Sequence, residues 1–409
     1  MTEIIATTDE VNEPQNDDIE AIFGDQSHAL DVTADELSNQ RKDFEPWHHP
    51  VKQVVRDRQW ASLTSRLLKD RPAGSLPVLK YFTLPGRDLL DVHVLSEACE
   101  PYGVKIQYFG FNSNLGSTKE PDATWVTTEA ALRQSGRITD DALVLSDRLE
   151  DIALENSQAA EALKGRLPFD VINIDACDHL AYSPPGREHS IFDALNALLR
   201  HQMRAHTPWL LFITTRVSPS LLAQPGLLFQ DAINKNLLVQ GSGFGAALAT
   251  CIGADAHRLA VEMPTIWGSN DNRFLKLYSV GLGKFLLQFF NGQPNLPANV
   301  ELASLYTYRV HGTQPDMLAL AFRITPDAVR VYAPNIGGAA VVPDLEPSRA
   351  IKVAQQAVKL QDLDHALETE VEVLGAAVNG TRKLLQQANY DLTAWQNWLA
   401  ELPQRPLIV

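Results

Sequence analysis

Cysteine is scarce in this chain, with three residues among 409, namely Cys99, Cys177 and Cys251. They lie far apart in the sequence and lack the Cys-x-x-Cys spacing that structural zinc sites and redox pairs use. We therefore expect neither a zinc site nor a disulfide framework. The three thiols are predicted to be buried, as free cysteines usually are.

Long hydrophobic runs are absent as well. No stretch of about 18 uncharged apolar residues occurs, although a transmembrane helix needs about 20. The N-terminal residues are acidic, whereas a targeting segment is basic. These absences predict a cytoplasmic protein that makes no membrane contact. With 45% hydrophobic residues, the chain has room for a large core, which excludes a single small module.

Positive charge is missing from residues 1–40, which hold eleven acidic side chains and no lysine or arginine. This segment carries −11 of the net charge of −15, so the rest of the chain carries only −4. A segment so charged and so poor in apolar residues does not offset the entropy cost of folding. It predicts a disordered acidic tail. The alternative is a tail that docks on a basic surface of this chain or of a protein partner.

Residues 41–76 form a basic lead-in to the rest of the chain. Its cations up to position 69 are Arg41, Lys42, Lys52, Arg56, Arg58, Arg66 and Lys69. In one interpretation, residues 51–68 form a surface helix that turns an apolar stripe to the core. That stripe consists of Val54, Trp60, Leu63 and Leu67.

In the other interpretation, Trp47 and Trp60 stack on nucleic-acid bases while the cations of residues 41–69 pair with phosphates. The remaining body carries too little positive charge for a broad nucleic-acid surface, so only this segment favours such a partner. His48 and His49 have no third ligand close in sequence, and we expect no metal site there.

From residue 77 onward, short β-rich runs alternate with longer helical runs, which is typical of βαβ units. Strands are predicted at residues 78–84, 104–111, 142–145, 169–174 and 209–214. Helices are predicted between them at residues 88–99, 155–164 and 190–206. Several strands are apolar on both faces, as parallel strands covered by helices are.

After the fifth predicted strand come two helical runs, residues 218–237 and 272–290, and then two apolar runs, 304–310 and 317–324. The six residues between the apolar runs suit a hairpin, so we expect an antiparallel pair at one edge of the sheet. The predicted fold class for residues 77–325 is therefore α/β, with an open, mostly parallel sheet closed by an antiparallel hairpin.

Residues 326–409 are predicted to be a helical C-terminal extension. Their apolar residues recur at helical spacing, and Gly380 is expected to break the run into two helices. Such an extension can serve as a lid, an oligomerisation element or a surface for a protein partner.

Candidate binding residues follow the predicted strands, because ligands of open parallel sheets bind at the carboxyl ends of the strands. Residues 84–86 follow the first strand and precede a helix, whose free N–H groups suit a carboxylate or phosphate. Asn112 follows the second strand, where its side chain can bond ribose hydroxyls. Asp147 follows the third strand, where it can read an adenine amino group or serve as a helix N-cap.

The fourth strand ends at Asp175, and Asp178 and His179 lie on the loop after it. Carboxylates beside an imidazole can hold a substrate or move a proton, and the alternative is a capped loop. Arg216 ends the fifth strand and can neutralise an anion or a surface acid. The glycines of residues 241–245 come after a helix, so they predict a turn or a helix entrance and not a dinucleotide loop.

In the order of its elements and in these polar strand ends, the segment 77–325 resembles a Rossmann-type, class I S-adenosylmethionine-dependent methyltransferase. The resemblance implies S-adenosylmethionine as cofactor, bound by Leu84, Pro85, Gly86, Asn112, Asp147 and Asp175. It also implies that Asp175 lies near the methyl donor and acts in catalysis with His179. Two departures weaken the expected affinity: the usual acidic-x-Gly-x-Gly loop is reduced to residues 83–86, and Asn112 replaces the usual acid.

Two other functions remain open at this stage. One is a catalytically inactive, Rossmann-like binding subunit of a larger complex. The other, less favoured, is a nicotinamide-dependent oxidoreductase, which the missing glycine fingerprint after the first strand opposes. Residues 81–92 and 171–178 are similar to segments of bacterial proteins from mobile or defence islands, which makes antiviral defence the expected context.

Overall fold

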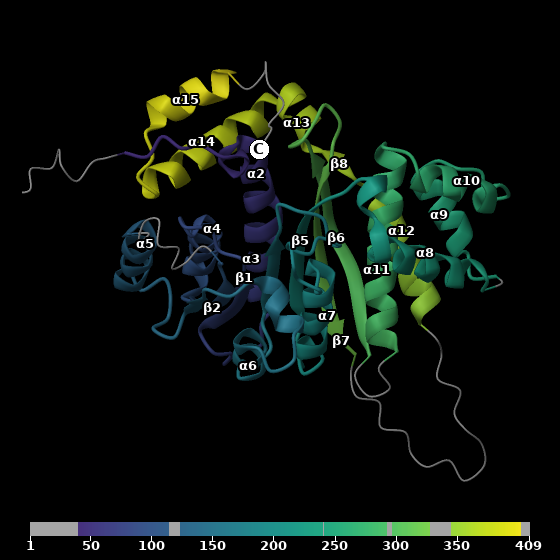
Figure 1. Ribbon diagram of the computed structural model, residues 1–409, viewed down its shortest axis with the longest axis horizontal. Coiled ribbons are helices and arrows are strands. Elements are labelled where there is room, and N and C mark those ends of the chain that lie inside the picture. Colours follow the sequence, from purple (N-terminus) through teal and green to yellow (C-terminus); the bar gives the residue numbers. More distant parts are fainter. Residues whose placement is uncertain (1–39, 114–122, 240, 293–296, 328–344, 402–409) are drawn as a thin grey trace, which may run out of the picture. The chain divides into compact units, whose positions relative to one another are not determined.

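A computed structural model of the chain describes residues 40–113, 123–239, 241–292, 297–327 and 345–401. Contacts divide the chain into two units, residues 1–41 and 42–409. The predicted acidic tail lies outside the described residues except for its last position. The fold described below is that of the second unit (Figure 1).

An eight-stranded sheet forms the centre of this unit, in the order β3-β2-β1-β4-β5-β7-β6-β8. Its strands are β1 (Val78–Thr83), β2 (Lys105–Phe111), β3 (Leu143–Leu145), β4 (Val171–Asp175), β5 (Trp209–Arg216), β6 (Ala298–Tyr308), β7 (Met317–Pro326) and β8 (Gln361–Asp362). The first five are parallel, whereas β7 runs antiparallel to both β5 and β6. The predicted α/β class, the five parallel strands and the hairpin are confirmed. The two-residue strand β8, which pairs with β6, was not predicted.

The chain moves outward from β1 to β3 and then returns to β4 on the other side of β1. This reversal of strand order creates a switch point between β1 and β4, where Thr83 pairs with Asn173. Open parallel sheets bind ligands at such points, beyond the carboxyl ends of the strands.

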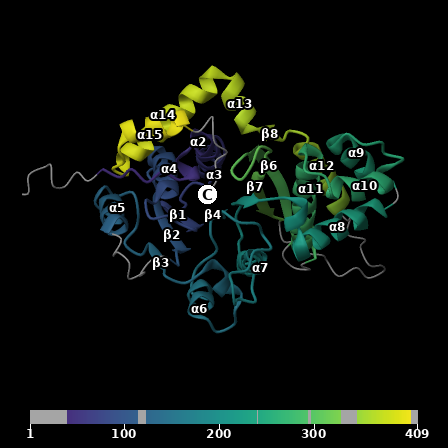
Figure 2. The ribbon, with the colours of Figure 1, turned by 45° about the horizontal axis from the view of Figure 1, so that its top comes forward.

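One face of the sheet is covered by α4 (Leu90–Cys99) and by a continuous helix that consists of α2 (Pro50–Val54), the π-helical η2 (Val55–Ala61) and α3 (Ser62–Lys69) (Figure 2). Val54, Trp60 and Leu67 of this helix are buried against the sheet. The helix interpretation of residues 51–68 is therefore confirmed. Because Trp60 is 1% exposed, its ring offers no face to a nucleic-acid base.

The other face is covered by α6 (Gln158–Lys164), α7 (Ile191–Gln202), α8 (Ala223–Leu237) and α11 (Asn272–Asn291). The strands present alternate residues to the two faces, so Phe82, Ile172 and Ile174 point to this side. Further helices are α5 (Ala123–Gln134), α9 (Phe244–Ile252) and α10 (Leu259–Trp267). Gly243 is the N-cap of α9, which confirms the predicted helix entrance.

The C-terminal segment contains α12 (Glu346–Ala357), α13 (Leu363–Thr369), α14 (Val371–Gln387) and α15 (Leu392–Glu401). Helix α12 packs against α9, α11 and β6 and buries Ala350, Val353 and Ala354 in the main core. Helices α14 and α15 lie beside α2 and α4 in both views (Figures 1 and 2).

Gly380 does not break this segment, contrary to prediction, because α14 continues through it. A Cβ atom at Gly380 would lie 2.9 Å from Cγ of Gln53, so the missing side chain lets α14 cross α2 closely. The prediction of three buried thiols was also wrong in part, since Cys177 is exposed while Cys99 and Cys251 are buried.

No helix among the described residues has the length and apolar character needed to cross a membrane.

Candidate functional site at the carboxyl ends of the strands

The structure brings the predicted cofactor residues to one edge of the sheet. Gly86, Asn112 and Asp147 follow β1, β2 and β3, and Asp175 ends β4. These four strands are parallel neighbours in the order β3-β2-β1-β4, so all four residues lie beyond or at carboxyl ends. The four residues differ in how many other groups of the chain already contact them.

The loop after β1 lies against the end of β2. Asn112 donates a hydrogen bond from Nδ2 to the Pro85 carbonyl oxygen at 3.0 Å. A Cβ atom at Gly110 would lie only 2.3 Å from the Thr83 carbonyl oxygen, so this strand position requires glycine. At Gly86, by contrast, a Cβ atom would meet nothing within 4 Å. Gly110 therefore permits the close approach of the loop, and Gly86 faces open space.

The helix after this loop begins without a side-chain cap, with Leu89 in the left-handed region at φ 49°. Asp88 just before it is buried and accepts a hydrogen bond at 2.9 Å from the Tyr390 hydroxyl. Tyr390 lies between α14 and α15, so the C-terminal helices cover the start of α4.

A buried polar chain links β1, β4 and α4. The Tyr81 and Thr83 hydroxyls both donate to Oδ2 of Asp91, at 2.7 and 2.5 Å. Nδ2 of Asn173 donates to the Tyr81 hydroxyl at 3.0 Å. Burial raises the pKa of Asp91, although the two hydroxyl donors oppose that rise.

Asp175 is paired with a residue that the sequence analysis left out of the site. Nζ of Lys52, on α2, lies 2.5 Å from Oδ1 of Asp175 and 3.4 Å from Oγ1 of Thr214. The Lys52 side chain is 5% exposed and that of Asp175 is 28% exposed. Burial lowers the pKa of Lys52, and Asp175 acts against that shift. Asp175 therefore lies under a helix and is already neutralised by a cation.

Arg56 is a second cation on the same helix face, and its side chain is buried. Its Nε and Nη1 atoms make no hydrogen bond to the described residues. Burial lowers the pKa of Arg56, and the charges of Asp175 and Asp91 oppose this effect. Lys52, Arg56 and Trp60 recur every fourth residue, and residues four apart lie on one face of a helix. This face of the helix is buried, since Lys52, Arg56 and Trp60 are 4%, 3% and 1% exposed.

The remaining predicted residues lie near this edge without forming one cluster. Asp147 does not cap a helix, because Arg148 is the N-cap of the short helix η4 (Leu149–Ala153). The Asp178 carbonyl oxygen accepts hydrogen bonds from the Arg216 backbone N–H and the Thr215 hydroxyl, which lays the loop after β4 along β5. His179 Nδ1 is buried and has no hydrogen-bond partner among the described residues. Burial lowers the pKa of His179, and Asp178 opposes that shift.

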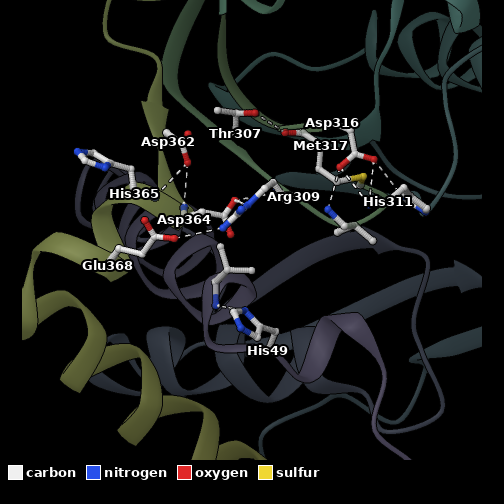
Figure 3. Close-up of polar contacts among 12 residues, drawn as sticks. His49, Thr307, Arg309, His311, Asp316, Met317, Asp362, Asp364, His365 and Glu368 are labelled. Carbon is white, nitrogen blue, oxygen red and sulfur yellow. Dashed lines mark hydrogen bonds and ion pairs between the residues drawn. The ribbon is translucent and has the colours of Figure 1, made fainter. Parts of the chain in front are cut away.

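The loop between β6 and β7 adds polar groups at the same edge, because Met317 at its end pairs with Arg216 at the end of β5. Figure 3 shows the polar contacts around this loop. Nδ1 of His311 lies 2.8 Å from Oδ2 of Asp316, and Asp316 Oδ1 accepts the Val310 N–H at 2.8 Å. Nearby, the Arg309 backbone N–H donates to Asp364, whose pKa burial raises to about 6. These contacts order the hairpin end and α13.

Sequence reasoning left Lys52, Arg56 and Gly110 out of this site: it named the two cations only as possible phosphate partners in residues 41–69, and both are buried. Lys52 and Asp175 are 123 positions apart, so no local spacing connects them. Gly110 carried a usable signal, since a glycine inside a strand pattern indicates a close approach of another backbone.

The described residues contain no group of three or more histidine, cysteine, aspartate or glutamate side chains placed to hold a metal ion. A search of curated proteins finds no match to this sequence. A family model described as PP_RS20740-like matches residues 41–400, which include every strand of the sheet and every residue of the candidate site. The chain therefore belongs to the PP_RS20740-like family.

Proposed function

We propose that this chain is an S-adenosylmethionine-dependent methyltransferase-like protein. The observation that carries the proposal is the strand order, in which antiparallel β7 is inserted between β5 and β6 after five parallel strands. Class I methyltransferases have this inventory of strands, whereas the dinucleotide-binding Rossmann sheet has strand order 3-2-1-4-5-6 and normally ends in another parallel strand.

The loop after β1 has room for a bulky cofactor beside Gly86. The space beside Gly86 is open, and the loop backbone is held in place by Asn112 and by the close contact at Gly110. In the proposal, residues 84–86 contact the cofactor, Asn112 contacts its ribose and Asp147 its adenine.

Asp175 and His179 have the catalytic roles in this proposal. The cofactor supplies a methyl group on a positively charged sulfur, and a carboxylate at the end of β4 favours positive charge beside it. The lowered pKa of His179 keeps its imidazole neutral near pH 7, which is the form that can accept a proton from a methyl acceptor.

Calorimetry with S-adenosylmethionine and S-adenosylhomocysteine tests the proposal. We expect saturable binding that weakens at least tenfold in a Gly86→Phe variant, because the new ring would fill the open space beside the loop. Gly375→Phe is the matched control, since Gly375 is exposed on α14 and a Cβ atom there also meets nothing within 4 Å. Absence of heat with either ligand, well above micromolar concentration, would contradict the proposal.

A second function is favoured by a different observation. Lys52 already forms an ion pair with Asp175 at the end of β4, and Tyr390 already donates a hydrogen bond to Asp88 in the loop after β1. Other side chains of the chain therefore already contact residues at or after the ends of both strands. These contacts support a catalytically inactive binding subunit whose partner contacts the C-terminal helices, where Val371 and Leu374 are exposed. This alternative predicts that the chain co-purifies with a protein partner and that Asp175→Asn leaves that association unchanged.

A further inference from the structure

The Lys52 ammonium group is surrounded by more than its carboxylate partner. Its Nζ lies 4.9 Å from the ring centroid of Trp60 and 6.0 Å from that of Tyr308. Asp175 Oδ1 is 2.5 Å away and Thr214 Oγ1 is 3.4 Å away. The four groups come from η2, β6, β4 and β5, so the fold itself assembles them around one point.

This combination of groups is the chemistry that recognises organic cations. Aromatic faces attract a cation within about 6 Å of the ring centroid, and such rings bind alkylated ammonium ions in recognition sites. A carboxylate at hydrogen-bond distance supplies the opposite charge. A lysine that needed only charge neutralisation would be satisfied by Asp175 alone, and the two rings add a preference for a cation that carries alkyl groups.

The position of this point in the fold is that of a ligand site. Asp175 ends β4, directly beside the switch point between β1 and β4. Its side chain is 28% exposed although that of Lys52 is 5% exposed, so the carboxylate side of the cluster opens to solvent. Cys177, two residues further on, is exposed as well.

We propose that Asp175, Trp60, Tyr308 and Thr214 form a binding site for a compact organic cation, and that Lys52 occupies it as an internal ligand. An external cation enters when the flexible Lys52 side chain turns away. The ligand class is an alkylated ammonium or sulfonium ion. The inference deepens the proposed function, because the cofactor proposed above carries a sulfonium centre, but its test requires neither cofactor nor acceptor.

Chemical rescue of a Lys52→Ala variant tests the site. This substitution removes Cγ, Cδ, Cε and Nζ, which together correspond to propylammonium. We expect Lys52→Ala to unfold at a lower urea concentration than the unsubstituted chain, and propylammonium chloride to raise that midpoint. At a tenfold excess over its dissociation constant, the amine raises the folded-to-unfolded ratio about elevenfold. Methylammonium and butylammonium should act more weakly, because one leaves a void and the other is too long.

Three comparisons make the result specific. Potassium chloride at equal concentration controls for ionic strength, and Lys164→Ala, at an exposed lysine paired with Glu161, controls for general effects of the amine. Lys52→Ala combined with Asp175→Asn removes the carboxylate and should lose the rescue. An equal effect of propylammonium and potassium chloride on Lys52→Ala, or a rescue that survives Asp175→Asn, would overturn the inference.

If Lys52→Ala does not fold, the same comparison is made on refolding from urea, with circular dichroism as the measure of recovered protein. Recovery that depends on propylammonium supports the site, and equal failure with and without it counts against the site. Lys52→Met, which fills the space without a charge, should fold and show no response to the amine.

Calorimetry of Lys52→Ala with S-adenosylmethionine tests whether the natural cation is the sulfonium of this cofactor or an alkylated ammonium ion. Binding by this variant, and weaker binding by the unsubstituted chain, would identify the sulfonium as the natural occupant and Lys52 as its competitor. Rescue by propylammonium without any S-adenosylmethionine binding would support the cation site and refute the proposed function. If the amine does not rescue the variant but S-adenosylmethionine still binds, the cation site is refuted and the proposed function is supported.

Discussion

The two faces of the sheet are built from the same strands and differ at the carboxyl end of β4. Phe82, Ile172 and Ile174 point toward α6 and α7 and belong to a cluster of buried apolar side chains. Their neighbours Asn173 and Asp175 point toward the α2–η2–α3 helix and α4, where they meet other polar and charged groups. Both faces bury an apolar cluster, but only the second face adds these polar pairs at the carboxyl end of β4.

The polar face also holds buried groups that lack a partner. Arg56 Nε and Nη1, Asn173 Oδ1 and both ring nitrogens of His93 make no hydrogen bond to the described residues. Unpaired buried polar groups cost free energy, and native proteins keep few of them. The comparison teaches that, at the end of β4, one side is stabilised by apolar packing alone, while the other side also contains polar groups whose burial costs free energy.

The largest effect is expected when the pair on the polar face is broken. Asp175→Leu leaves Lys52 and Arg56 buried beside no carboxylate at the end of β4. Removing one partner of a buried ion pair costs about 3–5 kcal/mol, since the remaining charge is uncompensated. Urea unfolding, followed by circular dichroism, measures the loss in the free energy of unfolding.

The double variant Lys52→Met with Asp175→Leu sharpens this prediction. It removes both charges and should recover more than half of the loss, because apolar replacements of buried ion pairs are often neutral. A double variant as unstable as Asp175→Leu alone would mean that shape, and not charge, holds this face.

On the apolar face, Ile174→Ala is the matching change one residue away in the same strand. Ile174 is fully buried, and truncation to alanine removes apolar contacts and leaves a cavity. Such changes cost about 2–5 kcal/mol, and we expect about 3 kcal/mol here. No second substitution of a charged residue should restore it, and ionic strength should not alter it. A loss that varied with salt would break the contrast between the faces.

A smaller effect is expected from two glycines at the carboxyl edge. Gly110→Ala places a Cβ atom 2.3 Å from the Thr83 carbonyl oxygen, a backbone atom that cannot move without shifting the loop after β1. Overpacking of this kind costs about 1–3 kcal/mol. In Gly86→Ala the new Cβ atom meets no atom within 4 Å. This variant should therefore change the free energy of unfolding by less than about 0.5 kcal/mol. Equal effects at both positions would contradict the close approach of the loop.

Most of the sheet could be predicted because each strand is marked by its own residues. The five parallel strands and β7 were found within two residues of their observed bounds, since apolar runs bounded by turn residues are local signals, whereas β6 begins six residues before its predicted start at residue 304. Strand β8 escaped prediction because two residues carry no periodicity. Gly380 was misread because a glycine inside a helical pattern has two meanings, a break or a close helix crossing, and only the neighbouring helix decides between them.

The candidate site could be predicted only in part, for the same physical reason. Asp175 was identified from its place at the end of an apolar strand, which is local information. Its partner Lys52 lies on a helix that reaches the sheet only through tertiary packing, so the spacing of residues along the sequence does not connect Lys52 with Asp175. The sequence therefore indicated Asp175 as a candidate site residue and not the Lys52 ammonium group that already contacts it.

A small effect that depends on pH is expected at His93, whose two ring nitrogens have no hydrogen-bond partner among the described residues. Its pKa is lowered from 6.5 to about 4 by burial and by Arg137, with Glu97 opposing. Because the folded pKa lies below the unfolded one, the unfolded chain binds the proton first, and stability present above pH 6.5 is lost as the pH falls toward 4. His93→Leu removes this proton and both unpaired nitrogens. At pH 7 the variant should therefore be as stable as the unsubstituted chain or slightly more so, and between pH 7 and pH 5.5 it should lose about 1 kcal/mol less. Urea unfolding at the two pH values measures this difference, and parallel losses in both proteins would show that the ring is not buried in the neutral form.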